Sequence, residues 1–483
     1  RGLRDLPRAA PRRRISIRVA RIGAAALLAV AALAFWRFGS DSQGAASSAS
    51  SALFAEGQKL LVTFDVAAAV DQLEKAAAND PNNPRIQSAL AAALSARGSE
   101  AAALVAARRG FELSASLAES ERWPIEARYR ALAHELPAAI ALYSKRLAAE
   151  PSDLDSGLAL AGVQITDGQL AGAQATLAAL RRLPAPRGLD PRIDLLAADA
   201  ARAAGDSAAQ RSAAMRAAER ARAIGAPQIV ARARFFEAYA LRQLGQPKPA
   251  LAAAEAARDL ATTGNNRTLE ALAWKEIGAL RTLDGDLGGA LEAFTRTVAA
   301  SEAVGARRIA LVGLNGRAIV LRRLGRLDEA AQTFDQLLEI QRDLGHPSGE
   351  AAAKNGQALV LLQLGRLAEA ENALDQAREI FFRLGDKSGE GTTQLNRCGL
   401  LTERGDLAAA RSRCQSALEL FRAAEEPSAL PEIQIALARI DRLAGEFDAA
   451  RSRLDRIEKP LRELGDESVS HAARLERAQL EFD

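Results

Sequence analysis

The order of apolar and polar residues along the chain is that of a helical protein. The stretch "LRRLGRLDEAAQTFDQLLEIQRDLG", Leu321 to Gly345, returns forty residues later as "LLQLGRLAEAENALDQAREIFFRLG". Runs of β-branched residues are few, and none alternates with the period of two that a half-buried strand requires. We therefore expect an almost entirely α-helical chain built from repeated units.

Glycines mark the ends of the expected helices. A first series recurs every forty residues without slippage: Gly205, Gly245, Gly285, Gly325, Gly365, Gly405 and Gly445. A second series lies half a period later, with Asn265 and Glu425 at two of its places: Gly225, Gly305, Gly345, Gly385 and Gly465. Glycine just past a helix end adopts the left-handed conformation of a C-cap without strain. Each unit is therefore predicted to hold two helices of about fifteen residues.

Two columns of small residues and one of larger residues predict how the helices pack. Small residues lie seven before and five after the first glycine, as in Ala318 and Ala330, and they let paired helices approach closely. Nine residues after the glycine the side chains are larger: Phe294, Phe334, Leu374, Cys414 and Leu454. One unit cannot cover this larger column, so we expect stability to come from stacking.

These columns resemble the tetratricopeptide repeat. "WKEIG", Trp274 to Gly278, is similar to the opening W-x-x-L-G of that family, and "FDVAAAVDQLEKAAANDPNNP" has its alanine and proline spacing with a 34-residue period. The resemblance implies an all-α solenoid, a right-handed superhelix of about eleven helix pairs. We expect units of about 34 residues over 52–187, units of 40 residues over 188–483, and a lone first helix at the end.

The first fifty residues have a different composition. Eight arginines within residues 1–23 precede "IGAAALLAVAALAFW", Ile22 to Trp36, which has no charged residue. We expect a basic juxtamembrane segment over 1–14 that ends a missing upstream domain, a transmembrane helix over 15–37 and a flexible linker over 38–51. The arginines would place the amino terminus in the cytoplasm and the repeats outside the inner membrane. A cleavable signal peptide and a buried or amphipathic helix are the alternatives.

Composition excludes several kinds of site. The net charge is only +4, which predicts no general affinity for nucleic acid. No phosphate loop, nucleophile elbow or zinc motif is present, and only three histidines occur, so neither an enzyme nor a cofactor is expected. "DGDLGGALE", Asp284 to Glu292, lacks the ligand spacing of a calcium loop. Cys398 and Cys414 fall in facing columns of one unit, either as two packed thiols or as a disulfide.

Binding is the remaining function, and the family resemblance suggests where it occurs. The first helices of such units line a concave groove. The family's groove positions fall on Arg242, Lys275, Asn315, Arg322, Arg323, Asn355, Gln363, Arg439 and Arg442. The resemblance implies that Asn315 and Asn355, in one column, bind a peptide backbone. The cations suit an acidic peptide or a free carboxylate. The alternative is an ordinary solvated face of an arginine-rich chain.

The sequence therefore predicts a protein-interaction or sensing region of a single-pass bacterial signalling protein. Its layout resembles the membrane-anchored repeat regions of bacterial serine/threonine kinases, winged-helix regulators and class III cyclases. A kinase or cyclase domain upstream would supply the output. The alternatives are a membrane-anchored scaffold for envelope assembly and the helical sensor of a cytoplasmic transcriptional regulator.

Overall fold

The computed structural model describes residues 48–464 and 467–482, and every regular element in them is a helix. The 34-residue units pair a helix over 48–62 with α2 (Val66–Asn79), α3 (Pro84–Arg97) with α4 (Glu100–Leu113), α5 (Glu119–Leu132) with α6 (Leu136–Ala149), and α7 (Leu154–Thr166) with α8 (Leu170–Arg181). Short 3-10 helices follow α4 and α8, namely η1 (Ser114–Ser116) and η2 (Arg187–Leu189).

The 40-residue units follow. They pair α9 (Pro191–Ala203) with α10 (Ser207–Ala223), α11 (Pro227–Gln243) with α12 (Pro247–Thr263), α13 (Arg267–Asp284) with α14 (Leu287–Glu302), α15 (Arg307–Arg323) with α16 (Leu327–Asp343), α17 (Pro347–Gln363) with α18 (Leu367–Leu384), α19 (Lys387–Glu403) with α20 (Leu407–Ala423), and α21 (Leu430–Leu443) with α22 (Phe447–Leu464). The 3-10 helix η3 (Pro427–Ala429) precedes α21, and α23 (Glu467–Phe482) closes the described chain as a first helix without a second.

The glycine columns end the helices as their spacing predicts. Gly325 and Gly345 have φ angles of 74° and 60°, in the left-handed region. Asn265 and Glu425, which replace glycine in the second series, adopt the same conformation at 51° and 58°. The turn geometry is therefore constant even where the residue is not, because the next helix must fold back against the previous one in every unit.

The small and large columns form the core. Ala318 and Ala330 are fully buried, and Phe334 joins them in a cluster that extends to α17 through Ala353 and Val360. Apolar area therefore leaves water mainly where neighbouring units meet, which is the stacking that the columns predict.

A buried carboxylate joins the shorter units to the longer ones. Asp194 in α9 is fully buried and lies 3.0 Å from Arg181 of α8, 2.7 Å from Arg220 and 3.3 Å from Arg216 of α10. Three cations surround one desolvated anion, as a buried charge requires. The change of period therefore occurs across a continuous helical stack.

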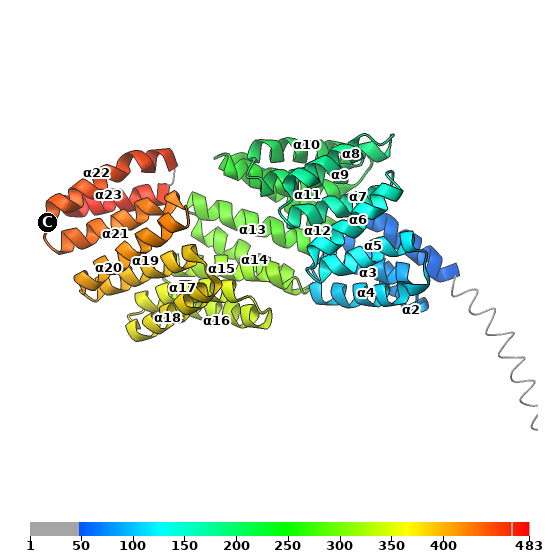
Figure 1. Ribbon diagram of the computed structural model, residues 1–483. Coiled ribbons are helices and arrows are strands. Elements are labelled where there is room, and N and C mark those ends of the chain that lie inside the picture. Colours follow the sequence, from blue (N-terminus) through cyan, green and yellow to red (C-terminus); the bar gives the residue numbers. More distant parts are fainter. Residues whose placement is uncertain (1–47, 465–466, 483) are drawn as a thin grey trace, which may run out of the picture.

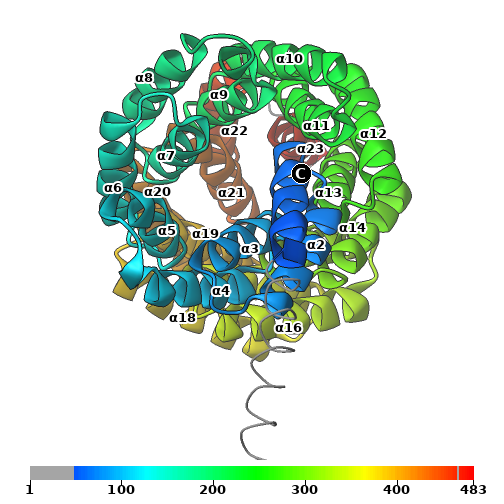
Figure 2. The same cartoon turned by 90° about the vertical axis from the view of Figure 1, so that its right-hand side faces the viewer.

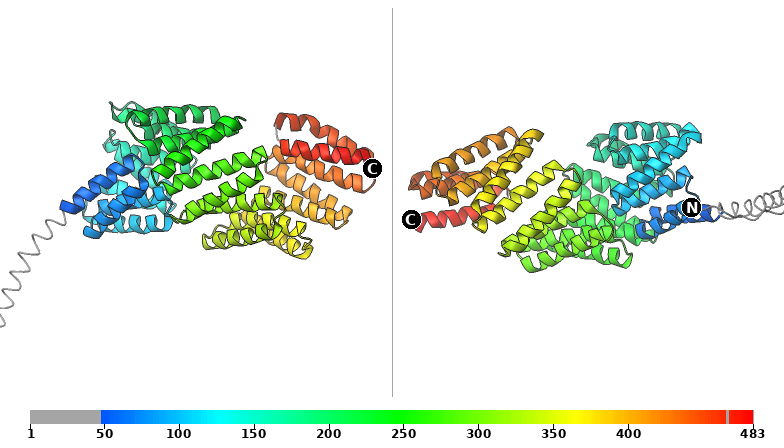
Figure 3. Two further views of the ribbon diagram at one scale, coloured as in Figure 1. Left: turned by 180° about the vertical axis from the view of Figure 1, so that it is seen from behind. Right: turned by 90° about the horizontal axis from the view of Figure 1, so that it is seen from below.

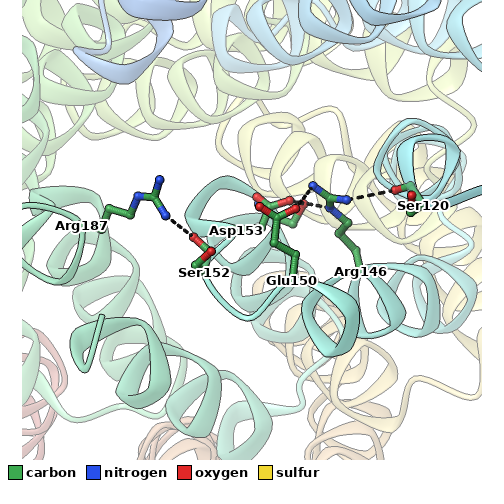
Figure 4. Close-up of polar contacts among 7 residues, drawn as sticks. Ser120, Arg146, Glu150, Ser152, Asp153 and Arg187 are labelled. Atoms are coloured by element: carbon green, nitrogen blue, oxygen red, sulfur yellow. Dashed lines mark hydrogen bonds and ion pairs between the residues drawn. The ribbon is translucent and has the colours of Figure 1, made fainter. Parts of the chain in front are cut away.

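A second polar cluster fixes the turn between α6 and α7. Figure 4 shows Arg146 of α6 pointing at Asp153, with Nε 2.7 Å from Oδ2, while its Nη1 donates to Ser120 O at 3.4 Å. Arg187 donates to Ser152 O in the same turn, at 3.3 Å. One turn is thereby tied to the units on both sides.

The units wind into a superhelix whose first turn closes on itself. Figure 1 shows the pairs stacked side by side, and in the end-on view of Figure 2 the first helices α3, α5, α7, α9 and α11 lie inside the second helices. Thr268 Oγ1 of α13 donates to Arg97 O at 2.6 Å, Ser99 Oγ donates to Val304 O at 2.9 Å, and Arg308 lies 2.9 Å from Glu100. Residues 171 to 208 positions apart thus meet. The two ends of the described chain lie at opposite ends of the long axis (Figure 3).

The expected membrane anchor requires correction. Among residues 48–464 and 467–482, no helix is both long enough and apolar enough to cross a membrane. The transmembrane prediction over 15–37 lies outside the described residues, as do the basic segment over 1–14 and most of the linker over 38–51. The described residues thus form an all-α solenoid that contains no transmembrane helix, and the predicted single-pass inner-membrane location, with its cytoplasmic amino terminus, is not supported.

Candidate partner-binding groove

Arginine occupies one position of the first helices in four units, as Arg202, Arg242, Arg322 and Arg442, and in two of these units the next first helix supplies a glutamate. Arg242 Nε of α11 lies 2.5 Å from Oε1 of Glu276, a fully buried residue of α13. Arg442 Nε of α21 lies 2.6 Å from Oε1 of Glu476 in α23. Each glutamate comes from the next first helix, 34 residues later. These two arginines therefore join neighbouring units.

Arg202 pairs with Asp199 of its own helix at 2.8 Å, whereas Arg322 of α15 has no such glutamate. The corresponding position is Gly356, where an added Cβ would lie 2.5 Å from the ring of Phe334. No ion pair joins half-buried Arg322 to another described residue. Burial lowers the pKa of its guanidinium, and the positive charge of Arg323 lowers it further. Arg322 is thus a partly desolvated cation whose counter-charge the fold does not supply.

Lys275 contacts the interior of the stack. Its Nζ lies 3.7 Å from Glu276 Oε2 and 5.4 Å from the centroid of the Phe235 ring. Burial lowers the pKa of this ammonium group, and Glu276 acts in the opposite direction. Lys275 therefore helps to neutralise the carboxylate that also binds Arg242.

The two asparagines of one column have different surroundings. Asn355 is buried, and its Nδ2 donates to Thr393 Oγ1 at 3.0 Å across the junction between α17 and α19. Asn315 is exposed on α15, because the position equivalent to Thr393 is Ala353, which offers no hydroxyl. The amide of Asn315 thus faces solvent.

The remaining groove positions are exposed. Arg323 and Gln363 occupy equivalent positions at the ends of α15 and α17. Arg439 lies 2.8 Å from Glu403, and both side chains are about half exposed. Such surface ion pairs contribute little and exchange easily.

The structure divides the nine predicted positions into two groups. Arg242, Lys275, Asn355, Arg439 and Arg442 have partners within the chain. Asn315, Arg322, Arg323 and Gln363 lie together on α15 and α17, where we define them as the α15–α17 patch. Asn315 and Arg322, seven residues apart, lie on one face of α15, roughly 10 Å apart along its axis.

Glu276 and Glu476 are the residues that the sequence reasoning missed. Both lie 34 residues after a groove arginine, so this spacing could have revealed them. The patch offers guanidinium and amide groups and no carboxylate. Guanidinium and amide groups bind carboxylates and peptide groups, and no cluster of three metal-ligating side chains occurs in residues 48–464 or 467–482.

Comparison with known proteins identifies the repeats. Residues 309–381, which include the whole α15–α17 patch, match the family model described as tetratricopeptide repeat. The chain carries tetratricopeptide repeats. No curated protein matches the sequence. The fold is consistent with a scaffold for protein–protein interaction, and folds of this kind are typically non-catalytic.

Solved structures are similar in fold alone. The apo form of RapI has 12% identity and a TM-score of 0.52, over 68% of this chain and 97% of that one. BtubC from P. vanneervenii has 22% identity and a TM-score of 0.37, over 47% and 92%. The signal transduction ATPase PH0952 from Pyrococcus horikoshii, which has a tetratricopeptide repeat sensor, has 11% identity and a TM-score of 0.47, over 79% and 55%. The predicted associations with kinases, cyclases and winged-helix regulators find no support in these matches.

Proposed function

We propose that this protein is an interaction scaffold whose α15–α17 patch binds an acidic segment of a protein partner. The observation that carries the proposal is Arg322. Its equivalents Arg242 and Arg442 are neutralised by Glu276 and Glu476, whereas Gly356 leaves Arg322 without a carboxylate. A glutamate or aspartate of the partner supplies the missing charge.

The neighbours of Arg322 suit an extended peptide. Arg323 adds a second cation, and the exposed amide of Asn315 can donate to and accept from a peptide group. A charge-assisted hydrogen bond to a half-buried guanidinium is stronger than one at the surface, since less water competes for it. The patch therefore favours a carboxylate side chain within an extended peptide over a ligand that is only negatively charged.

The test uses a labelled dodecapeptide with alternating glutamate and a second peptide with glutamine in its place. Fluorescence anisotropy should show that the glutamate peptide binds more tightly and that salt weakens its binding. Arg322→Gln with Arg323→Gln should reduce its affinity at least tenfold, and Asn315→Ala should reduce it by a smaller factor. None of these changes should alter thermal stability much, because the groups have no partner within the described fold.

A charge-matched control separates the patch from the net charge. Arg296 and Arg383 lie exposed on the second helices α14 and α18, paired with Glu292 and Glu379. Arg296→Gln with Arg383→Gln removes the same charge and should leave affinity unchanged. Equal loss in both double variants, or equal binding of the glutamine peptide, would contradict the proposal.

A further inference from the structure

A separate chamber lies inside the closed first turn of the superhelix. It has a volume of about 540 Å³, and its walls come from the helix over 48–62, from the start of α2 and from α3, α5, α7, α9 and α11. The view down the superhelix in Figure 2 shows these first helices around the interior of the turn. The chamber shares no residue with the α15–α17 patch.

Most of the chamber wall is apolar. Leu158 of α7, Leu195 of α9 and Phe236 of α11 face it, together with Phe64, which follows the helix over 48–62. Small-ligand sites are typically pockets of roughly 300–1,000 Å³ with mostly apolar walls and a few placed polar groups. The volume and lining of this chamber fit that description.

Two arginines provide the polar groups. Arg128 of α5 donates through Nη1 to Ser88 O at 3.0 Å and to Ser88 Oγ at 2.6 Å, both uncharged. The Arg232 guanidinium of α11 lies 5.6 Å from the centroid of the Phe64 ring and 5.7 Å from that of Phe236. No ion pair joins either arginine to another of the described residues. Both charges therefore lack a carboxylate partner.

The other charged groups of the chamber are already paired. Asp199 lies 2.8 Å from Arg202, Arg192 lies 2.9 Å from Asp155, and Lys59 lies 3.6 Å from Glu56. Burial lowers the pKa of Arg232, although the charge of Asp199 acts in the opposite direction. The unmatched charge in the chamber is thus positive.

The turn at Phe64 brings an aromatic ring to the chamber wall. The φ angle of Phe64 is 61°, a left-handed conformation that Gly98 and Gly168 adopt at the ends of α3 and α7. A non-glycine residue in this conformation costs about 1–2 kcal/mol. Phe64 nevertheless packs its ring against the core cluster of Leu195 and Phe236 and beneath Arg232. This left-handed turn, which His134 also adopts at φ 62°, places the aromatic ring of Phe64 beside an unpaired cation.

We propose that this chamber binds a small amphiphilic carboxylate, with its acid group at Arg128 or Arg232 and its apolar part against Leu158, Leu195 and Phe236. A carboxylate supplies the anion that both guanidinium groups lack. A hydrocarbon group displaces water from the apolar wall at about 25 cal/mol for each Å² that it covers. A pocket of this volume suits a single small molecule better than it suits the surface of a protein partner.

The experiment is calorimetric titration of the whole chain with decanoate, and with decanol as the uncharged probe of equal length. Decanoate should bind with one-to-one stoichiometry, and decanol at least tenfold more weakly. Arg128→Gln with Arg232→Gln should weaken decanoate binding at least tenfold and leave decanol binding nearly unchanged. Circular dichroism establishes that the variant remains helical.

Two further variants keep the proposal testable if that double variant fails to fold. Ala92 of α3 lines the chamber, so Ala92→Trp should fill it and abolish binding while both arginines remain. Arg322→Gln with Arg323→Gln should leave decanoate binding intact, so failure of the chamber and failure of the groove are distinguishable. Absence of decanoate binding, equal affinity for decanol, or displacement of decanoate by the glutamate dodecapeptide at the chamber would overturn the proposal.

Discussion

The ring of Phe334 in α16 occupies the space that a side chain at Gly356 in α17 would need, since a Cβ there would lie 2.5 Å from Phe334 Cε1. The preceding unit repeats the relationship with Phe294 and Gly316. Where the same column of the second helix holds Ala254, the facing residue is Glu276. A phenylalanine ring in the second helix thus excludes the glutamate that would neutralise the groove arginine, whereas Leu454 in the same column leaves room for Glu476.

The first prediction concerns this contact. Gly356→Ala should destabilise α16 and α17 by about 1–3 kcal/mol, because the methyl group overpacks the core. Phe334→Leu should relieve the clash. The double variant should therefore lose less free energy of unfolding than the sum of the losses in the two single variants. Gly399 of α19 is the control, since nothing lies within 4 Å of its added Cβ. Gly399→Ala should be neutral or stabilising by up to about 1 kcal/mol. Urea unfolding measures the stability of each variant, and hydrogen exchange shows whether the change lies in α16 and α17.

The second prediction compares a buried ion pair with an exposed one. Glu276→Ala should cost about 3–5 kcal/mol of local stability, because Arg242 and Lys275 would keep buried charges without a counter-ion. Glu403→Ala breaks the surface pair with Arg439 and should cost at most about 1 kcal/mol. Urea unfolding of both variants decides it. Similar losses would mean that burial does not distinguish the pairs.

The third prediction concerns Cys398 of α19 and Cys414 of α20, whose Sγ atoms are bonded in the structure with the Cα atoms 5.4 Å apart. Thiol titration of unreduced, denatured protein should find no free thiol. Reduction should lower the stability of this unit by about 3 kcal/mol, the expected effect of opening a loop of this length. Two titratable thiols in the unreduced protein would show that the residues are packed thiols instead.

The fourth prediction is a pH dependence at Asp153, which caps α7. Burial raises the pKa of this carboxyl, but hydrogen bonds from Ser156 and Arg146 outweigh it, so the pKa lies below its ordinary value of 3.8. A lowered pKa in the folded state stabilises the protein above the unfolded-state pKa, and this stabilisation is lost as pH falls through the folded-state pKa. Wild type should therefore exceed Asp153→Asn in stability by a constant amount above about pH 5, and the difference should shrink below about pH 4. Urea unfolding between pH 3 and pH 7 measures it. If the difference in stability between wild type and Asp153→Asn does not change with pH, the charge of Asp153 does not cause it.

Much of the fold was predictable, because it depends on neighbours in the chain. The glycines end the helices through a local backbone conformation. The columns of Ala318 and Ala330 hold small residues where paired helices meet, so a forty-residue period is enough to predict the stack. The groove was predictable only as a set of positions. Asn315 and Asn355 share a column, yet one is exposed and the other is bonded to Thr393, since the opposite residue differs between units.

The sequence by itself determined the repeated helix pairs, the columns that stack them and the helices that carry the groove, because all three follow from local conformation and the contact of adjacent units. Only the tertiary structure decided which cations are neutralised and where the first turn closes. Thr268 meets Arg97 across 171 residues, and the chamber needs side chains from seven helices. Such contacts depend on the small rotation between units, which adds up along the stack and leaves no periodic signal in the sequence.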